Sequence, residues 1–117
     1  MSISLGEAQR LHVRCFSKLL NWGFAQGYEF TWGQALRTQA EALANAKSGA
    51  GIAHSLHLLK LAVDINLFKD GLYQPTTEAH RPLGTYWKTL HPLCCWGGDF
   101  TTRPDGNHYS ITFNGIK

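Results

Sequence analysis

The sequence predicts a single α+β domain in which helices flank a small antiparallel sheet. Its length of 117 residues suits one compact domain with one core. Helical patterns come mainly first, and short strand-like runs cluster around a hairpin signal in the second half. This order favours an antiparallel sheet over the alternating strand–helix order of a parallel one. No internal repeat or linker divides residues 1–117, which we therefore treat as one domain.

The first part of the chain predicts a long amphipathic helix and then a strand. Ser4 and Glu7 form an S-x-x-E capping box, which indicates a helix start. Apolar residues then recur at three- and four-residue spacing over residues 3–26. Gly27 is a natural stop for this helix. Residues 28–32 alternate aromatic and polar side chains, which predicts a short strand.

The remaining elements are shorter. A second capping box predicts a helix over residues 38–47, and apolar residues predict a buried strand over 61–68. Asp70-Gly71 indicates a tight hairpin turn. A third helix is expected to begin near Pro82 and to end near residue 90, since proline suits the first helical turn. A loop-rich segment follows, and we expect a final strand over residues 109–113.

Composition excludes several classes of protein. Hydrophobic residues make up 44% of the chain, which is far from the composition of disordered proteins. The net charge of +3 is a mild bias towards anionic partners such as cell-wall polymers. Basic residues are spread singly, so we expect no nucleic-acid partner. No apolar run approaches the about 18 residues of a membrane span, and no secretory signal is visible. We expect a monomer that is made in the cytoplasm and does not insert stably into a membrane.

The cysteines do not predict a disulfide framework or a thiolate metal site. An odd count with two adjacent residues favours free thiols. Adjacent cysteines also lack the C-x₂₋₄-C spacing of zinc sites. The three are Cys15, Cys94 and Cys95.

Two acid–histidine pairs are the strongest candidates for chemistry. Asp64 lies within an apolar strand, where its charge needs a salt bridge, backbone hydrogen bonds or a metal. If the final strand pairs with this one, Asp64 and His108 face each other with Cβ atoms about 4.5–5.5 Å apart. Adding His57 gives three ligands with a fourth position open, as in catalytic zinc sites. Asp105 would lie beside the bound water as general base. A purely structural histidine–aspartate pair is the alternative.

The spacing of these residues resembles a known family. Three stretches carry the resemblance: the pattern S-x-H-x₄-A-x-D at residues 55–64, the segment W-G-G-D-F at residues 96–100, and the distant D-x-x-H at residues 105–108. They resemble the zinc-dependent D-Ala-D-Ala carboxypeptidase and L-alanyl-D-glutamate endopeptidase family. The short bacteriophage endolysins of that family are the most similar, and the resemblance extends from the first helix through Phe113. It implies that Asp105 is the catalytic base. It also implies three zinc ligands: His57, Asp64 and His108.

The resemblance also suggests residues that bind the substrate. The family has an arginine upstream of the first histidine, and Arg37 occupies the matching region; a solvated surface arginine is the alternative. Ser55 is expected either to hydrogen-bond the substrate or to cap the turn that presents His57. Lys60 stands where many members have glycine, and Ser110 stands where many have glutamate. These departures leave the ligands and the base in place.

Other residues are expected to have structural roles. His12 lies near the apolar stripe of the first helix, and His54 is expected to point to solvent. His80 could line the cleft, but a surface or capping role is expected. Asp99 could rival Asp105 as base but is expected to stabilise a turn, and Trp96 could form a cleft wall. Core positions are expected for Trp22, Trp32 and Trp87.

The resemblance implies a zinc-dependent peptidoglycan peptidase, namely a phage endolysin that hydrolyses the L-Ala-D-Glu bond of cell-wall stem peptides. It would reach the wall from the host cytoplasm once the membrane is breached. One alternative is a D-Ala-D-Ala carboxypeptidase of the same family. Another is a non-catalytic, zinc-stabilised domain that binds the cell wall, although such a domain has no use for Asp105. A lysozyme needs paired carboxylates, and no glutamate here has an obvious acidic partner.

Overall fold

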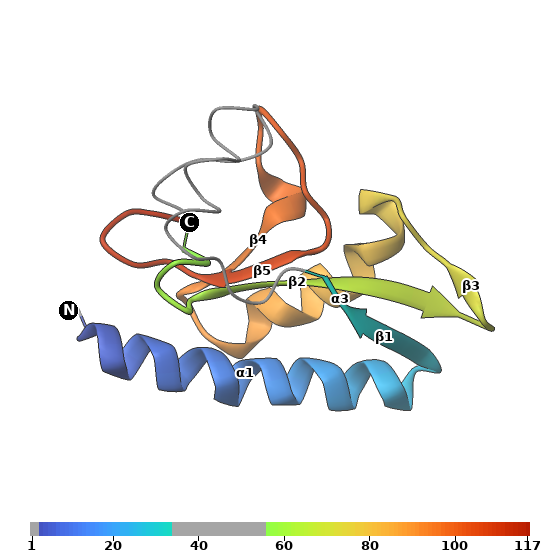
Figure 1. Ribbon diagram of the computed structural model, residues 1–117, viewed down its shortest axis with the longest axis horizontal. Helices are drawn as coiled ribbons and strands as arrows, with labels where there is room; N and C mark the ends of the chain where they lie inside the picture. The colour runs from blue at the N-terminus through green and yellow to red at the C-terminus, as the bar shows by residue number, and fades with distance from the viewer. Residues whose placement is uncertain (1–2, 34–55) are drawn as a thin grey trace.

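The computed structural model describes residues 3–33 and 56–117, and these form an α+β domain, as predicted (Figure 1). In chain order the elements are α1 (Leu5–Ala25), β1 (Tyr28–Trp32), β2 (Ala62–Lys69), β3 (Leu72–Tyr73), α3 (Thr77–Leu90), β4 (Cys94–Trp96), the 3₁₀ helix η1 (Gly97–Asp99) and β5 (His108–Ile111). The helix predicted over residues 38–47 lies outside the described residues. Among the described residues, no helix has both the length and the apolar character needed to cross a membrane.

Helix α1 begins and ends almost where the sequence predicts. The Ser4 hydroxyl accepts the Glu7 backbone N–H at 3.1 Å, and the Glu7 carboxylate accepts the Ser4 N–H at 3.0 Å, so the capping box is complete. Gly27 follows the helix with a φ of 91°, a conformation that glycine adopts without steric penalty. The chain then turns directly into β1.

The sheet is antiparallel and has the strand order β1-β2-β5-β4, with β3 paired to β2. The β2–β3 hairpin turns at Asp70 and Gly71, which have φ values of 53° and 77°. Two positive φ values are typical of a type I′ turn, so the hairpin prediction is confirmed. The last strand also pairs with the Asp64 strand, which was the condition for a shared metal site, and Asp64 and His108 are register partners.

The second half also differs from the prediction at three points. Helix α3 begins at Thr77 and not near Pro82, because the Thr76 hydroxyl accepts the Ala79 N–H at 3.1 Å and caps the helix there. Pro82 lies inside the helix. Strand β4 was not predicted, since three residues are too few to show a period. Strand β5 begins at His108, one residue earlier than expected, and ends at Ile111.

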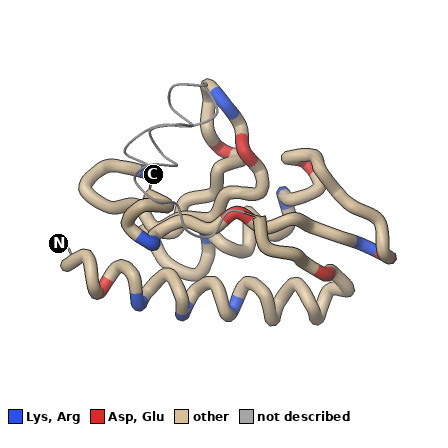
Figure 2. Tube along the Cα trace, in the orientation of Figure 1, with Lys and Arg blue, Asp and Glu red and all other residues tan. Residues whose placement is uncertain are grey.

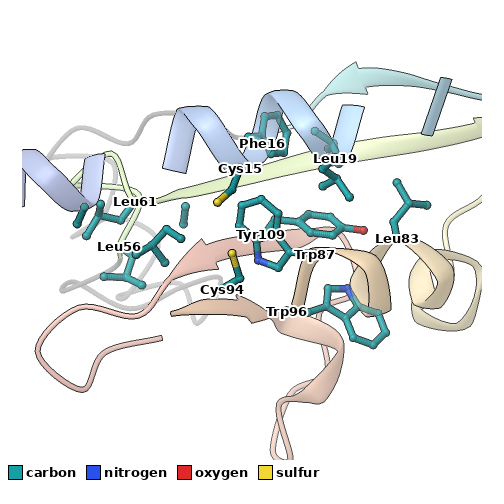
Figure 3. Close-up of a cluster of buried hydrophobic side chains, with 14 of the residues drawn as sticks. Cys15, Phe16, Leu19, Leu56, Leu61, Leu83, Trp87, Cys94, Trp96 and Tyr109 are labelled. Carbon is teal, nitrogen blue, oxygen red and sulfur yellow. The ribbon is translucent and has the colours of Figure 1, made fainter. Parts of the chain in front are cut away.

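The core lies between the sheet and the two helices (Figure 3). Trp87 of α3 and Tyr109 of β5 are fully buried and meet with ring centroids 5.9 Å apart. Trp96 is also fully buried, so it is a core residue and not a cleft wall. Trp32 was expected in the core, but this prediction is wrong, since 63% of its surface is exposed. It ends β1, an edge strand, where one side has no neighbour.

Two buried histidines, one on each helix, bind to Tyr109 and connect the helices to β5. His12 of α1 places Nε2 3.0 Å from the Tyr109 carbonyl oxygen, which confirms its structural role. His80 of α3 places Nδ1 2.9 Å from the Tyr109 hydroxyl. The surface or capping role expected for His80 is wrong, because only 2% of its surface is exposed. Burial lowers the pKa of His80 to about 4, so the ring is neutral near pH 7.

Candidate metal centre

Strand geometry places Asp64 and His108 on the face of the sheet that points away from the helices. Successive side chains of a strand point to opposite faces. Tyr109 contacts helix residues on one face, so its neighbour His108 points to the other. Asp64 is the register partner of His108 and lies on that same face. The loop that joins β4 to β5 covers this side of the sheet in Figure 1.

A tight turn before β2 supplies the third group, His57. Within it, Leu61 donates its backbone N–H to the Leu56 carbonyl at 3.0 Å, and Lys60 donates its backbone N–H to the His57 carbonyl at 3.3 Å. Lys60 has a φ of 59°, in the left-handed region that favours glycine. This conformation explains why glycine suits the position in the family that the sequence resembles. The Gln9 side chain donates to the Leu59 carbonyl at 2.9 Å and fastens the turn to α1.

The three groups meet around one point. His57 Nε2 lies 3.4 Å from Asp64 Oδ1, and His108 Nδ1 lies 3.5 Å from the same oxygen. These distances exceed the about 2.7–3.2 Å of ordinary hydrogen bonds. Zinc bonds to nitrogen and oxygen are about 2.0–2.2 Å long, so ligand atoms at the tetrahedral angle lie about 3.4 Å apart. The spacing therefore fits three ligands of one zinc ion.

Burial and charge also fit a metal. His57 and His108 are 3% and 7% exposed, and Asp64 Oδ1 and His108 Nε2 are buried side-chain atoms without a hydrogen bond. Burial alone would raise the pKa of Asp64, but the two histidines outweigh it and lower that pKa to about 2. The carboxylate is thus ionised, as a metal ligand must be. In the described part of the chain, this is the one group of three or more such side chains that could hold a metal.

Asp105 lies on the loop that leads into His108, and backbone contacts hold this loop. Asp105 donates its N–H to the Gly97 carbonyl at 2.9 Å, and its own carbonyl accepts the His108 N–H at 3.2 Å. The Trp96 indole donates to the Gly106 carbonyl at 2.7 Å. A Cβ on Gly97 would lie 2.2 Å from the Asp105 carbonyl oxygen, so only glycine allows this approach. Asp105 is therefore held next to the metal cluster by main-chain packing.

The electrostatics of Asp105 suit a proton acceptor. Its side chain is exposed to solvent. Partial desolvation raises its pKa above the ordinary value, and the nearby charge of Asp64 raises it further, while His108 and His57 lower it in part. A general base works best when its pKa is brought towards the operating pH. The carboxyl group can thus receive a proton near the metal cluster.

Asp99 and the cysteines lie outside the metal cluster. Asp99 ends η1, and its carboxylate lies 2.8 Å from the ammonium group of Lys88 on α3. Its carboxylate thus forms an ion pair with another element, and the expected role of this side chain in stabilising a turn stays a prediction. The three cysteines are free thiols, as predicted. Burial raises the pKa of Cys94, which keeps that thiol protonated.

Two contributors to the site are not evident from spacing. Gly97 admits the Asp105 loop, and the Phe100 ring lies 5.4 Å from that of His108, on which it packs. Both belong to the segment W-G-G-D-F at residues 96–100, whose glycine pair is the sequence signal for a close backbone approach. The expected substrate-binding residues Arg37 and Ser55 lie outside the described residues.

Comparison with known proteins identifies the family. A family model described as D-alanyl-D-alanine carboxypeptidase matches residues 48–111, more than half of the chain, including both parts of the histidine–aspartate motif. No curated protein matches the sequence significantly.

Solved structures share the fold at low identity. The L-Ala D-Glu endopeptidase ChiX of Serratia marcescens matches with a TM-score of 0.71 and 19% identity, over 96% of this chain and 89% of ChiX. The vancomycin resistance D,D-pentapeptidase VanY, solved in complex with Zn(II), matches with a TM-score of 0.60 and 21% identity, over 87% of this chain and 70% of VanY. By the match of its sequence to the family model, the chain belongs to the D-alanyl-D-alanine carboxypeptidase family, a family of zinc peptidases that act on peptidoglycan.

Proposed function

We propose that the protein is a zinc-dependent endopeptidase that hydrolyses the L-Ala-D-Glu bond of peptidoglycan stem peptides and serves as a phage endolysin. The observation that carries this proposal is the convergence of His57, Asp64 and His108 at zinc-ligand spacing. Asp105 lies on the loop that leads into β5, the strand that begins with His108. A site that only stabilised the fold would need the three ligands but not this acid.

We assign the metal to three side chains and the proton transfer to a fourth. His57, Asp64 and His108 would hold zinc, which when bound supplies Lewis-acid activation of water and of the scissile carbonyl. Asp105 accepts the proton of the attacking water and then donates it to the departing amine. Arg37 is proposed to stabilise the oxyanion, and Ser55 to hydrogen-bond the substrate.

The choice of bond is supported by the extent of the structural match. The likeness to the L-Ala D-Glu endopeptidase ChiX covers nearly all of both chains, whereas the likeness to VanY leaves part of VanY uncovered. The alternative is cleavage of the terminal D-Ala-D-Ala bond, which the description of the matching family favours. The two reactions release different products, so chemical analysis separates them.

The proposed biological setting is lysis of a bacterial host. An enzyme made in the cytoplasm would reach the wall when another agent breaches the membrane. A net charge of +3 is compatible with an anionic wall polymer as partner. We propose that residues 1–117 act as one catalytic domain and as a monomer.

Digestion of purified peptidoglycan by the zinc-loaded protein tests this function. Mass spectrometry of the muropeptides should show cleavage between L-Ala and D-Glu, with release of free amines and no new reducing ends. Loss of a terminal D-Ala alone would support the carboxypeptidase instead. Bound zinc without any amine release would support the non-catalytic domain, and new reducing ends without amines would support a lysozyme.

A further inference from the structure

The turn that carries Asp105 is attached to helix α3 as well as to Gly97. Gly106, the next residue, donates its backbone N–H to the Thr77 hydroxyl at 3.2 Å. The Gly106 carbonyl accepts the Trp96 indole N–H at 2.7 Å. Gly106 is buried, so both polar groups of its main chain need partners, and both find them in side chains from outside the turn.

Thr77 also approaches the turn with its main chain. It is the first residue of α3, and a Cβ on Gly106 would lie 2.6 Å from the Thr77 Cα atom. The start of the helix is capped by the neighbouring Thr76, whose hydroxyl accepts the Ala79 N–H at 3.1 Å. The two adjacent threonines therefore have different roles: the first caps the helix, and the second binds the turn of the β4–β5 loop.

A second contact holds α3 to the same segment. One turn further along the helix, His80 Nδ1 lies 2.9 Å from the Tyr109 hydroxyl. Tyr109 directly follows His108, a proposed zinc ligand. Helix α3 thus contacts the chain on both sides of that ligand, at Gly106 and at Tyr109. The first two turns of α3 therefore form a support for the segment from the proposed base to the proposed ligand.

The direction of the Asp105 side chain depends on this backbone. The side chain is exposed, so core packing does not hold it. In Figure 2, acidic positions (red) lie on the loop between β4 and β5 and on the sheet below it. The peptide group between Asp105 and Gly106 is bonded at both of its polar atoms: its N–H to Thr77, and its carbonyl to the His108 N–H at 3.2 Å. Because a peptide group is planar, these two bonds together limit rotation at the Asp105 Cα.

We propose that Thr77 is a positioning residue for the reaction: its hydroxyl fixes the peptide group between Asp105 and Gly106 and so directs the Asp105 carboxyl towards the metal cluster. The inference rests on the proposed peptidase function. Loss of the hydroxyl would leave the buried Gly106 N–H without this acceptor, which favours rotation of the peptide group. None of the three proposed zinc ligands belongs to this peptide group, so metal binding should be retained.

The kinetic test uses the exchange of threonine for valine, which keeps the shape of the side chain but removes the hydroxyl. Zinc-loaded Thr77→Val should hydrolyse stem peptides with a kcat lowered by about 10–100-fold, while KM and zinc content stay near those of the wild type. Thr77→Ser keeps the hydroxyl and should restore most of the lost kcat. Thr89→Val is the control and should behave as wild type, because the Thr89 hydroxyl donates to the Tyr86 carbonyl near the other end of α3.

Amide hydrogen exchange of the same zinc-loaded proteins gives a measurement that does not depend on activity. The Gly106 amide should exchange about tenfold faster in Thr77→Val than in the wild type, and at the wild-type rate in Thr89→Val. An unchanged Gly106 exchange rate in Thr77→Val would overturn the inference, as would a wild-type kcat in that variant. Absence of hydrolysis by the wild-type protein would instead count against the peptidase function, and faster Gly106 exchange in Thr77→Val would still support the attachment of the turn to α3.

Discussion

Gly97 and Asp105 are joined through their backbones, with the Asp105 N–H donated to the Gly97 carbonyl at 2.9 Å. The two main chains approach so closely that a Cβ on Gly97 would lie 2.2 Å from the Asp105 carbonyl oxygen and 2.7 Å from the His108 Cβ. One glycine therefore determines where both the proposed base and a proposed zinc ligand lie. This contact leads to the first prediction.

Gly97→Ala should displace the Asp105 loop and lower kcat/KM on stem peptides by about 100-fold, since misplacement of a catalytic group by 1 Å can have that effect. The measurement is steady-state hydrolysis with zinc content determined in parallel. Gly71→Ala is the control, because Gly71 also has a special conformation, with a φ of 77°, but lies in the β2–β3 hairpin turn. Activity of Gly97→Ala equal to that of Gly71→Ala would contradict the packing argument.

Asp105→Asn should lower kcat by about 10²–10⁴-fold, because the amide cannot accept the proton of the attacking water. Bound zinc and thermal stability should remain near those of the wild type, since Asp105 is not one of the three proposed ligands. Asp99→Asn provides the matched control, and it should keep its activity because Asp99 pairs with Lys88. If Asp99→Asn were the inactive variant, the two aspartates would have to exchange roles.

Lys60→Gly should stabilise the protein by about 1 kcal/mol, because the left-handed conformation costs a non-glycine residue about 1–2 kcal/mol and glycine returns part of this as chain entropy. Chemical denaturation measures the difference in the free energy of unfolding. Lys60→Ala removes the same charge but keeps a Cβ, so it should give no comparable gain. Equal stability of the two variants would show that the φ of Lys60 is not strained.

His80 should make the stability fall as the solution becomes acidic. Its pKa is lowered from 6.5 to about 4, so the unfolded chain binds the proton more readily than the folded one. The stabilising effect is therefore complete above pH 6.5 and is lost as the pH falls towards 4. The loss should approach about 3 kcal/mol.

The comparison protein for this prediction is His80→Asn, which can still hydrogen-bond the Tyr109 hydroxyl but does not titrate. Unfolding by denaturant is followed from pH 7 to pH 4 without metal in both proteins. All other side chains are the same in both proteins, so the difference between the two curves isolates His80. Parallel curves would refute this assignment of the pH dependence.

Much of the fold and of the metal cluster is predictable from sequence because the relevant signals are local or periodic. The capping box at Ser4 and Glu7 begins α1 as expected. The Asp70-Gly71 turn defines one hairpin. The pairing of Asp64 with His108 follows once two short apolar strands are assumed to be neighbours, since an acid within such a strand needs a partner.

Other features depend on contacts that no short window contains. Helix α3 begins after Thr76 and not near Pro82, because the Thr76 hydroxyl accepts a backbone N–H of the first helical turn. His80 is buried with its ring bonded to the Tyr109 hydroxyl, 29 residues later in the chain, and this partner offsets the cost of burying a polar group. Trp32 is exposed because β1 lies at the sheet edge, which is a property of strand order and not of residue type.

The central claim concerns one metal ion and four side chains, and an anomalous diffraction measurement at the zinc edge tests it most directly. Crystals of the zinc-loaded protein should show one strong anomalous peak about 2.0–2.2 Å from His57, Asp64 and His108. The Asp105 carboxyl should face the open coordination position. The peak should be absent in His57→Ala prepared in the same way. A peak on other residues, or an Asp105 carboxyl turned away from the ion, would contradict the account.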